Sequence, residues 1–117
     1  MSVNSAIRTA LDDYVKDGWL VQPDLIDVNK DHYITFNVYY DGGDNFGDDA
    51  PEHNVVSVYV HMYLPMQENY LAHKRRIRQL LFEYGFTYAE ITEMDDPDRE
   101  GYRHVIFDVM YVEESEV

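Results

Sequence analysis

The chain of 117 residues contains no cysteine. This absence excludes disulfide bonds and thiolate metal ligands, and it fits life in a reducing compartment such as the cytoplasm. Long apolar runs are also missing, since no stretch approaches the roughly 20 residues that a membrane-spanning helix needs. The first residues, MSVNSAIRTALDDY, lack a basic start followed by an apolar run, so we expect no secretory signal peptide and no membrane contact.

Cations are scarce as well. Nine lysines and arginines stand against 23 aspartates and glutamates, which gives a formal net charge of −14. Such a chain repels nucleic acid over most of its surface, because phosphate binding needs clustered cations, and we expect no direct nucleic-acid partner. The acidic residues concentrate over 90–100 and in the segment DGGDNFGDDAPEH, which includes Asp41, Asp44, Asp48 and Asp49.

Apolar residues are plentiful by contrast. Hydrophobic residues make up 45% of the chain and aromatic residues 15%, so the chain has enough apolar surface to fold unaided. A chain of this length can bury one core but is too short for two. We therefore predict a single domain over residues 1–117.

Two helices are predicted from apolar residues at helical spacing. The first covers 2–17 and ends at Gly18, and the second covers 67–84 and ends at Gly85, because glycine readily adopts the left-handed conformation of a helix cap. Their proposed inward stripes are Val3, Ile7, Leu11 and Tyr14 in the first helix, and Leu71, Lys74, Ile77, Leu81 and Tyr84 in the second.

Five strands are predicted from β-branched and aromatic residues in alternation. They cover 24–28 as a short edge strand, 32–40, 54–64, 87–94 and 102–112. The resulting order, α-β-β-β-α-β-β, with hairpin-like joins, predicts an α+β fold. In that fold a mostly antiparallel β-sheet carries two helices packed on one face.

The other face of this sheet is unusually aromatic for a surface in water. The residues expected there are Tyr33, Tyr39, Tyr59, Tyr63, Tyr88 and Tyr102, with His61 and His104 among them. One interpretation is that tyrosine is simply a good strand residue with its hydroxyl group in water. The other is a protein–protein interface, because such interfaces are enriched in aromatic residues.

No arrangement of residues points to catalysis. The five histidines are scattered, and His61 and His104 would supply two ligands at most, whereas zinc sites need three or four. Asp108 lies in an apolar strand, and a structural contact with a tyrosine or arginine explains it better than catalysis. We therefore predict a protein that is not an enzyme, with no catalytic residue, no cofactor and no metal site.

The segment HKRRIR gives the second helix four of the nine cations. A solvated helix face is its simplest interpretation. Alternatively, the basic helix of one subunit meets the acidic loop of the next, because head-to-tail contacts between unlike surfaces close into rings. The interface predicted for an oligomer or partner comprises Lys74, Arg75, Arg76, Arg78, Asp41, Asp44, Asp48, Asp49, Tyr59 and Tyr63.

The order of these segments over 24–112 resembles the tail terminator, or tail-completion, proteins of long-tailed phages and prophages. The resemblance lies in DLI at 24–26, YITFNVY at 33–39, the acidic loop and the valine-rich strand that ends at Pro65. It continues through NYL at 69–71, the helix over 74–84, Gly85-Phe86 and, above all, RHVIF at 103–107.

The family is similar in fold to the minor tail protein U of phage lambda, an α+β sandwich that forms a ring. The resemblance implies a hexameric ring that caps the tail tube, ends tail elongation and forms the head–tail joining surface. The implied partners are other copies of the chain, the tail tube protein and the head–tail connector protein. The implied location is the host cytoplasm during assembly and then the virion tail. Two alternatives remain open: an acidic DNA-mimic inhibitor of a host DNA-binding protein, and another neck component such as a head-closure subunit.

Overall fold

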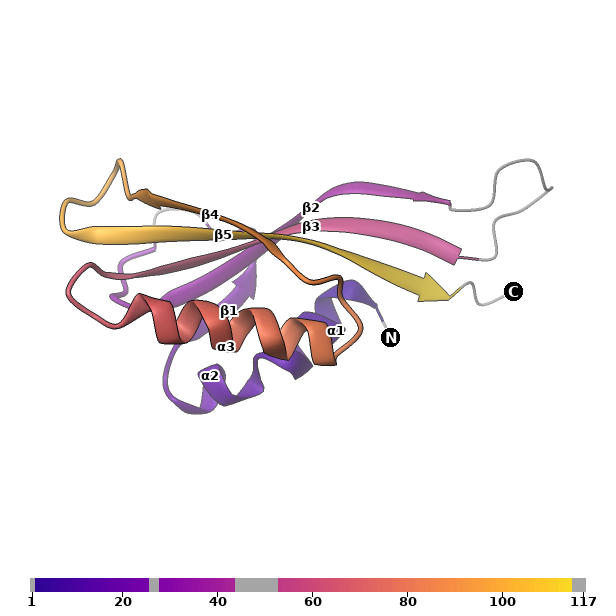
Figure 1. Cartoon of the computed structure of the whole chain (residues 1–117), viewed down its shortest axis with the longest axis horizontal. Coiled ribbons are helices and arrows are strands. Elements are labelled where there is room, and N and C mark those ends of the chain that lie inside the picture. The colour runs from indigo at the N-terminus through magenta and orange to yellow at the C-terminus, as the bar shows by residue number, and fades with distance from the viewer. Residues whose placement is uncertain (1, 26–27, 44–52, 115–117) are drawn as a thin grey trace.

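The computed structural model describes residues 2–25, 28–43 and 53–114, and it places all of its helices on one side of a single sheet (Figure 1). The sheet has the strand order β1-β2-β3-β5-β4. Strands β1 and β2 are parallel, and the other neighbours are antiparallel. The elements are α1 (Val3–Ala10), α2 (Asp12–Lys16), β1 (Leu20–Pro23), β2 (Tyr33–Gly43), β3 (His53–Pro65), α3 (Tyr70–Glu83), β4 (Glu90–Asp95) and β5 (Tyr102–Glu114).

This arrangement confirms the predicted α+β fold with a mostly antiparallel sheet and helices on one face. The helix count differs, because the predicted N-terminal helix is two short helices separated at Leu11, where φ is −102° and ψ is 19°. Asp12 and Asp13 begin the second of them, and acidic side chains stabilise the positive end of a helix. Gly18 follows with φ of +93°, as a glycine cap requires.

The first strand lies earlier in the chain than predicted. We expected an edge strand over 24–28, but β1 occupies Leu20–Pro23 and pairs with the start of β2. Pro23 has no N–H group to donate, which suits the end of an edge strand. Asp24 then adopts a φ of +52°, a conformation that takes the chain out of the strand. Residues 26–27 lie outside the described ranges.

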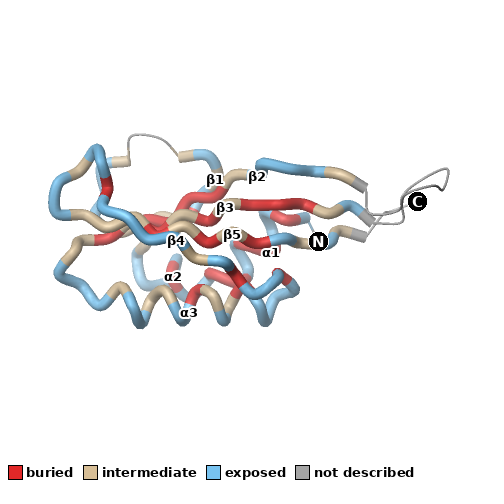
Figure 2. The backbone as a smooth tube through the Cα atoms, turned by 45° about the horizontal axis from the view of Figure 1, so that its top comes forward, coloured by how far each residue is buried: buried red, intermediate tan, exposed pale blue. Residues whose placement is uncertain are grey.

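The core lies between the helices and the inward face of the sheet. Five alternate residues of β3, from Val56 to Leu64, are at most 1% exposed, as the alternation predicted. The helices add Ile7, Leu11 and Tyr14 from the N-terminal pair and Ile77 and Leu81 from α3. Figure 2 shows this buried layer between the sheet and α3.

The predicted inward stripe of α3 is partly wrong. Ile77 and Leu81 are buried, but Leu71 is 37% exposed and Tyr84, the C-terminal cap, is 45% exposed. Successive steps of three residues cover only about 300° of a helix with 3.6 residues per turn. A stripe built on such steps therefore turns gradually around the helix axis, so that the residues at its two ends no longer face the core.

Candidate functional site

The sheet face without helix cover, called the open face below, carries the candidate site (Figure 2). The register places Thr35 and Asn37 of β2, His61 and Tyr63 of β3 and Ile106 of β5 on it. The outward strand positions of the described residues include no lysine or arginine. The open face is therefore aromatic and polar, and its fixed charges are negative.

Aromatic rings stack across the strands of this face. Tyr33 and Tyr63 have ring centroids 4.4 Å apart, and Tyr63 and His104 continue the row at 4.2 Å. Tyr39 and Tyr59 form a second stack at 4.1 Å. A break in the β2–β3 register between Val38 and Tyr40 lies at Tyr39, as a β-bulge does when it re-aims a side chain. Tyr59 and Tyr63, both predicted interface residues, thus belong to two ordered ring stacks.

A hydrogen-bonded chain joins three side chains at the centre of the face. His61 Nε2 lies 2.9 Å from Asn37 Oδ1, and His61 Nδ1 lies 2.8 Å from His104 Nε2. Because the Asn37 oxygen accepts, His61 Nε2 carries the proton, and neutral His61 accepts from His104 through Nδ1. The structure confirms that His61 and His104 are neighbours.

Burial keeps both imidazoles neutral. Desolvation, with a smaller contribution from the charge of His104, lowers the pKa of His61 to about 4. Desolvation also lowers the pKa of His104, although Asp96 opposes that shift. Burial and the neighbouring Tyr33 raise the pKa of Tyr63 to about 12. At neutral pH the centre of the open face therefore carries no charge on its rings.

Two carboxylates flank this neutral centre. Asp108 accepts a hydrogen bond of 2.7 Å from the Tyr39 hydroxyl group, which confirms the expected structural contact with a tyrosine. Glu90 lies directly opposite Asp108 in the β4–β5 register, and like charges in this position repel each other. Both border a hollow of about 360 Å³, called the anionic hollow below, lined by Tyr59, His61, Glu90, Thr92, Ile106 and Asp108.

A larger hollow of about 510 Å³ lies where the same face meets the turn before β5. Its wall combines Tyr33, Tyr63 and His104 with the charged turn that carries Asp96, Asp98 and Arg99. Arg99 of this turn donates a hydrogen bond of 2.6 Å to the Lys30 carbonyl oxygen, and Tyr102, directly after the turn, donates one of 2.6 Å to Asp31. The open face is thus a broad, hollowed surface rather than a single deep cleft.

The four predicted cations of α3 point in different directions. Lys74 forms an ion pair with Glu93 of β4, and Arg76 forms one of 3.2 Å with Asp13 of α2. The Arg78 guanidinium lies 4.5 Å from the centroid of the Tyr88 ring. Arg75 is exposed and, within the described ranges, has neither an ion pair nor a side-chain hydrogen bond.

The predicted acidic loop is only partly described. Asp41 is exposed near the end of β2, whereas Asp44, Asp48 and Asp49 lie outside the described residues.

The prediction that Tyr88 lies on the open face is wrong. Its ring packs edge-on against Phe82 of α3, at 5.7 Å between centroids, and therefore lies on the helix side. It precedes β4, so strand alternation does not determine its direction.

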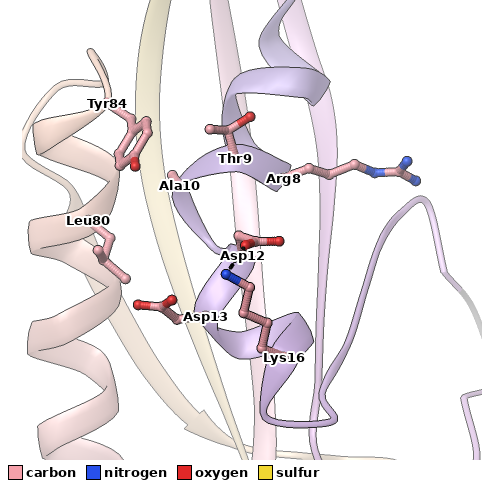
Figure 3. Close-up of a pocket in the computed structure, with 8 residues that line it drawn as sticks. All are labelled: Arg8, Thr9, Ala10, Asp12, Asp13, Lys16, Leu80 and Tyr84. Atoms are coloured by element: carbon pink, nitrogen blue, oxygen red, sulfur yellow. Dashed lines mark ion pairs between the residues drawn. The ribbon is translucent and has the colours of Figure 1, made fainter.

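A groove of about 500 Å³ between the helices is of a different kind (Figure 3). Asp12 and Lys16 form an ion pair of 2.9 Å at its edge, and Arg8 points away from α3. Leu80 and Tyr84 form its other wall. Asp13 points toward α3 but is paired with Arg76, and the other charged groups are paired or turned outward, so the open face remains the better candidate site.

Sequence reasoning missed Asn37 and the anionic hollow. Neither has a local motif, because both depend on which strands are neighbours and on their register.

The described residues contain no group of three or more histidine, aspartate or glutamate side chains placed to hold a metal ion. None of the described helices is long and apolar enough to cross a membrane. No protein-family model matches the chain, and no curated protein matches it.

Proposed function

We propose that the chain is a virion structural protein of a phage or prophage. It assembles with copies of itself into a ring of six, caps the tail tube, ends tail elongation and provides the surface for head–tail joining. The observation that supports this function best is the open face, where ordered aromatic rings lie partly exposed without a covering helix. The resemblance of the 24–112 segment order to tail terminators supplies the biological setting.

The mechanism is steric and electrostatic. A closed ring at the end of the tube offers no free edge to the next tube subunit, so elongation stops. Aromatic side chains suit this role, because they provide large contact areas at low conformational cost. The proposed partners are the tail tube protein on one side of the ring and the head–tail connector protein on the other. Assembly takes place in the host cytoplasm and leaves the protein in the virion tail.

Native mass spectrometry over a series of protein and salt concentrations tests this function. We expect a closed oligomer, with six copies as the dominant species, and shorter tubes when the protein is added to polymerising tail tube subunits. A chain that stays monomeric at high concentration and leaves tube length unchanged would refute the proposal. An oligomer that has no effect on tube length would leave assembly standing and refute the capping role.

A further inference from the structure

We propose that the open face of one copy receives one side of α3 from the next copy. This contact rests on the proposed ring assembly and identifies the two surfaces that join. The surface on α3, called the α3 stripe below, consists of Leu71, Arg75, Arg78 and Phe82, with Tyr88 beside it.

The α3 stripe is both apolar and cationic. Its four helical residues follow the spacing i, i+4, i+7 and i+11, which keeps them on one side of a helix. Phe82 is 52% exposed and Tyr88 55% exposed, and because the two rings pack against each other they form a contiguous apolar patch, as interaction sites do. Arg75 and Arg78 have no carboxylate partner within the described part of the chain. The stripe therefore has exposed apolar area and two positive charges without a carboxylate partner, of which Arg75 is exposed and Arg78 is half-buried against the Tyr88 ring.

The open face has the opposite charge and a matching chemistry. Glu90 is exposed and Asp108 is half-buried, and neither has a cation partner among the described residues. The hydrogen bond that Asp108 accepts comes from the neutral hydroxyl group of Tyr39. Both carboxylates face the anionic hollow beside Tyr59. A guanidinium group entering the hollow would relieve the repulsion between Glu90 and Asp108, and it can also stack on an aromatic ring.

The remaining cations fit this role less well. Lys74 and Arg76 already have carboxylate partners within the chain, and so do Lys16 and Arg99. Arg8 is also without a carboxylate partner in the described part, but it belongs to α1 and points away from α3. Lys30 and Arg103 also lack a carboxylate partner in the described part, but Lys30 donates to the Gly18 carbonyl oxygen, and the Arg103 guanidinium lies 3.9 Å from the centroid of the Tyr70 ring. Among the cations without a carboxylate partner, Arg75 and Arg78 are therefore the two that lie on α3 with the exposed rings of Phe82 and Tyr88.

The two surfaces lie on opposite layers of the molecule, since α3 covers one side of the sheet and the open face is the other (Figure 1). A contact between them joins unlike surfaces, and repetition of such a contact gives a ring when the rotation closes. Two copies with a net charge of −14 repel at long range, but salt near 0.15 M limits this repulsion to about 8 Å. Paired charges in direct contact are screened less.

The experiment compares Arg75→Glu, Glu90→Arg and an equal mixture of both variants, with the wild-type chain as reference. Association is followed by native mass spectrometry and by sedimentation at fixed salt near 0.15 M. Arg8→Glu is the matched control for Arg75→Glu, because it makes the same charge change at another exposed arginine. Circular dichroism first establishes that every variant is folded, and surface changes of this kind alter stability little.

We expect each single variant to associate at least about tenfold more weakly than wild type, and Arg8→Glu to stay close to wild type. The mixture should recover most of the association. In a mixed ring, the glutamate introduced by Arg75→Glu in one copy meets the arginine introduced by Glu90→Arg in its neighbour. The next contact pairs the native Arg75 with the native Glu90. An even-numbered ring with alternating copies then contains no like-charged contact.

Different results separate this contact from the proposed function. If the wild-type chain assembles, and Arg75→Glu and Glu90→Arg associate as strongly as Arg8→Glu, the contact is refuted and the ring assembly stands. Weakened variants without recovery in the mixture would also refute it, because the two charges would not face each other. If the copies form linear oligomers that each single variant weakens and the mixture restores, but these oligomers never close, the contact is supported and the ring is refuted. A monomeric wild type would refute both.

Discussion

The two faces of the sheet are built by the same strands and differ in how their side chains are held. On the helix-covered face, residues such as Val60 and Phe107 are fully buried aliphatic and aromatic groups. On the open face, their sequence neighbours Tyr59, His61 and Ile106 border hollows and lie partly in water. At these positions the helix-covered face excludes water, whereas the open face keeps its side chains ordered while they remain in contact with water.

The two faces therefore differ in what they contribute: one contributes most of the free energy of folding, and the other keeps its side chains in fixed positions. The helix-covered face stabilises the fold through burial, at roughly 25 cal/mol per Å² of apolar surface. The open face relies on ring stacking and on the hydrogen bonds of His61 and Tyr39, and each such contact contributes about 1 kcal/mol or less. A face that is ordered at so little gain in stability, and left uncovered, is suited to contact with another molecule.

The largest expected effect contrasts two neighbours on β5. Phe107→Ala should lower the free energy of unfolding by about 3–5 kcal/mol, because it leaves a cavity in a closed core. Ile106→Ala should lower it by about 1 kcal/mol, because Ile106 already borders a hollow open to solvent. Urea unfolding followed by circular dichroism measures both values. Equal losses would mean that the open face contributes to the core as much as the covered face does.

Period-two and period-3.6 patterns were sufficient to predict most of the fold. The inward residues of β3 and β5, the glycine caps at Gly18 and Gly85 and the sidedness of the helices follow from local alternation and turn chemistry. The alternation also predicted that His61 and His104 share a face. The ring stacks follow from the register, since Tyr33 and Tyr63 are directly paired.

Long-range placement limited what the sequence could predict. Strand β1 was misplaced because four residues carry too little pattern, and its partner lies in a parallel strand further along the chain. The cations of α3 read as one cluster, yet Lys74 and Arg76 bind Glu93 and Asp13 on elements far away in sequence. Such pairings depend on the angle of the helix over the sheet, which no local motif encodes.

An intermediate effect concerns pH. The lowered pKa values of His61 and His104 mean that, below pH 6.5, the unfolded chain binds more protons at these two groups than the folded chain does. Stability is therefore unaffected by these groups above pH 6.5 and falls as pH drops toward 4. We expect His61 alone to account for a loss of about 1 kcal/mol between pH 6.5 and pH 5, and His104 to add to that loss in the same direction. The figure is below the full linkage value of about 1.4 kcal/mol per pH unit, because the His61 ring is partly exposed.

The matched variant for this measurement is His61→Gln/His104→Gln. Its stability should change less over the same interval, which lies above the range where most carboxylates titrate. His73, whose pKa is also lowered by burial, remains in both proteins and contributes equally to each. A variant with the wild-type slope would show that the open-face histidines titrate as they do in water.

The smallest expected effect concerns the hydroxyl group of Tyr39. Tyr39→Phe removes the hydrogen bond to Asp108 and should change the free energy of unfolding by about 0.5 kcal/mol or less, because the pair is exposed to water. Tyr40→Phe is the control at an adjacent exposed tyrosine. The informative measurement is association, since Tyr39 holds the carboxylate that the proposed contact uses. If Tyr39→Phe weakens assembly more than Tyr40→Phe while their stabilities stay equal, the bond orients Asp108 for a partner. If assembly is equal as well, the bond is a local feature of the bulge and does not orient Asp108 for a partner.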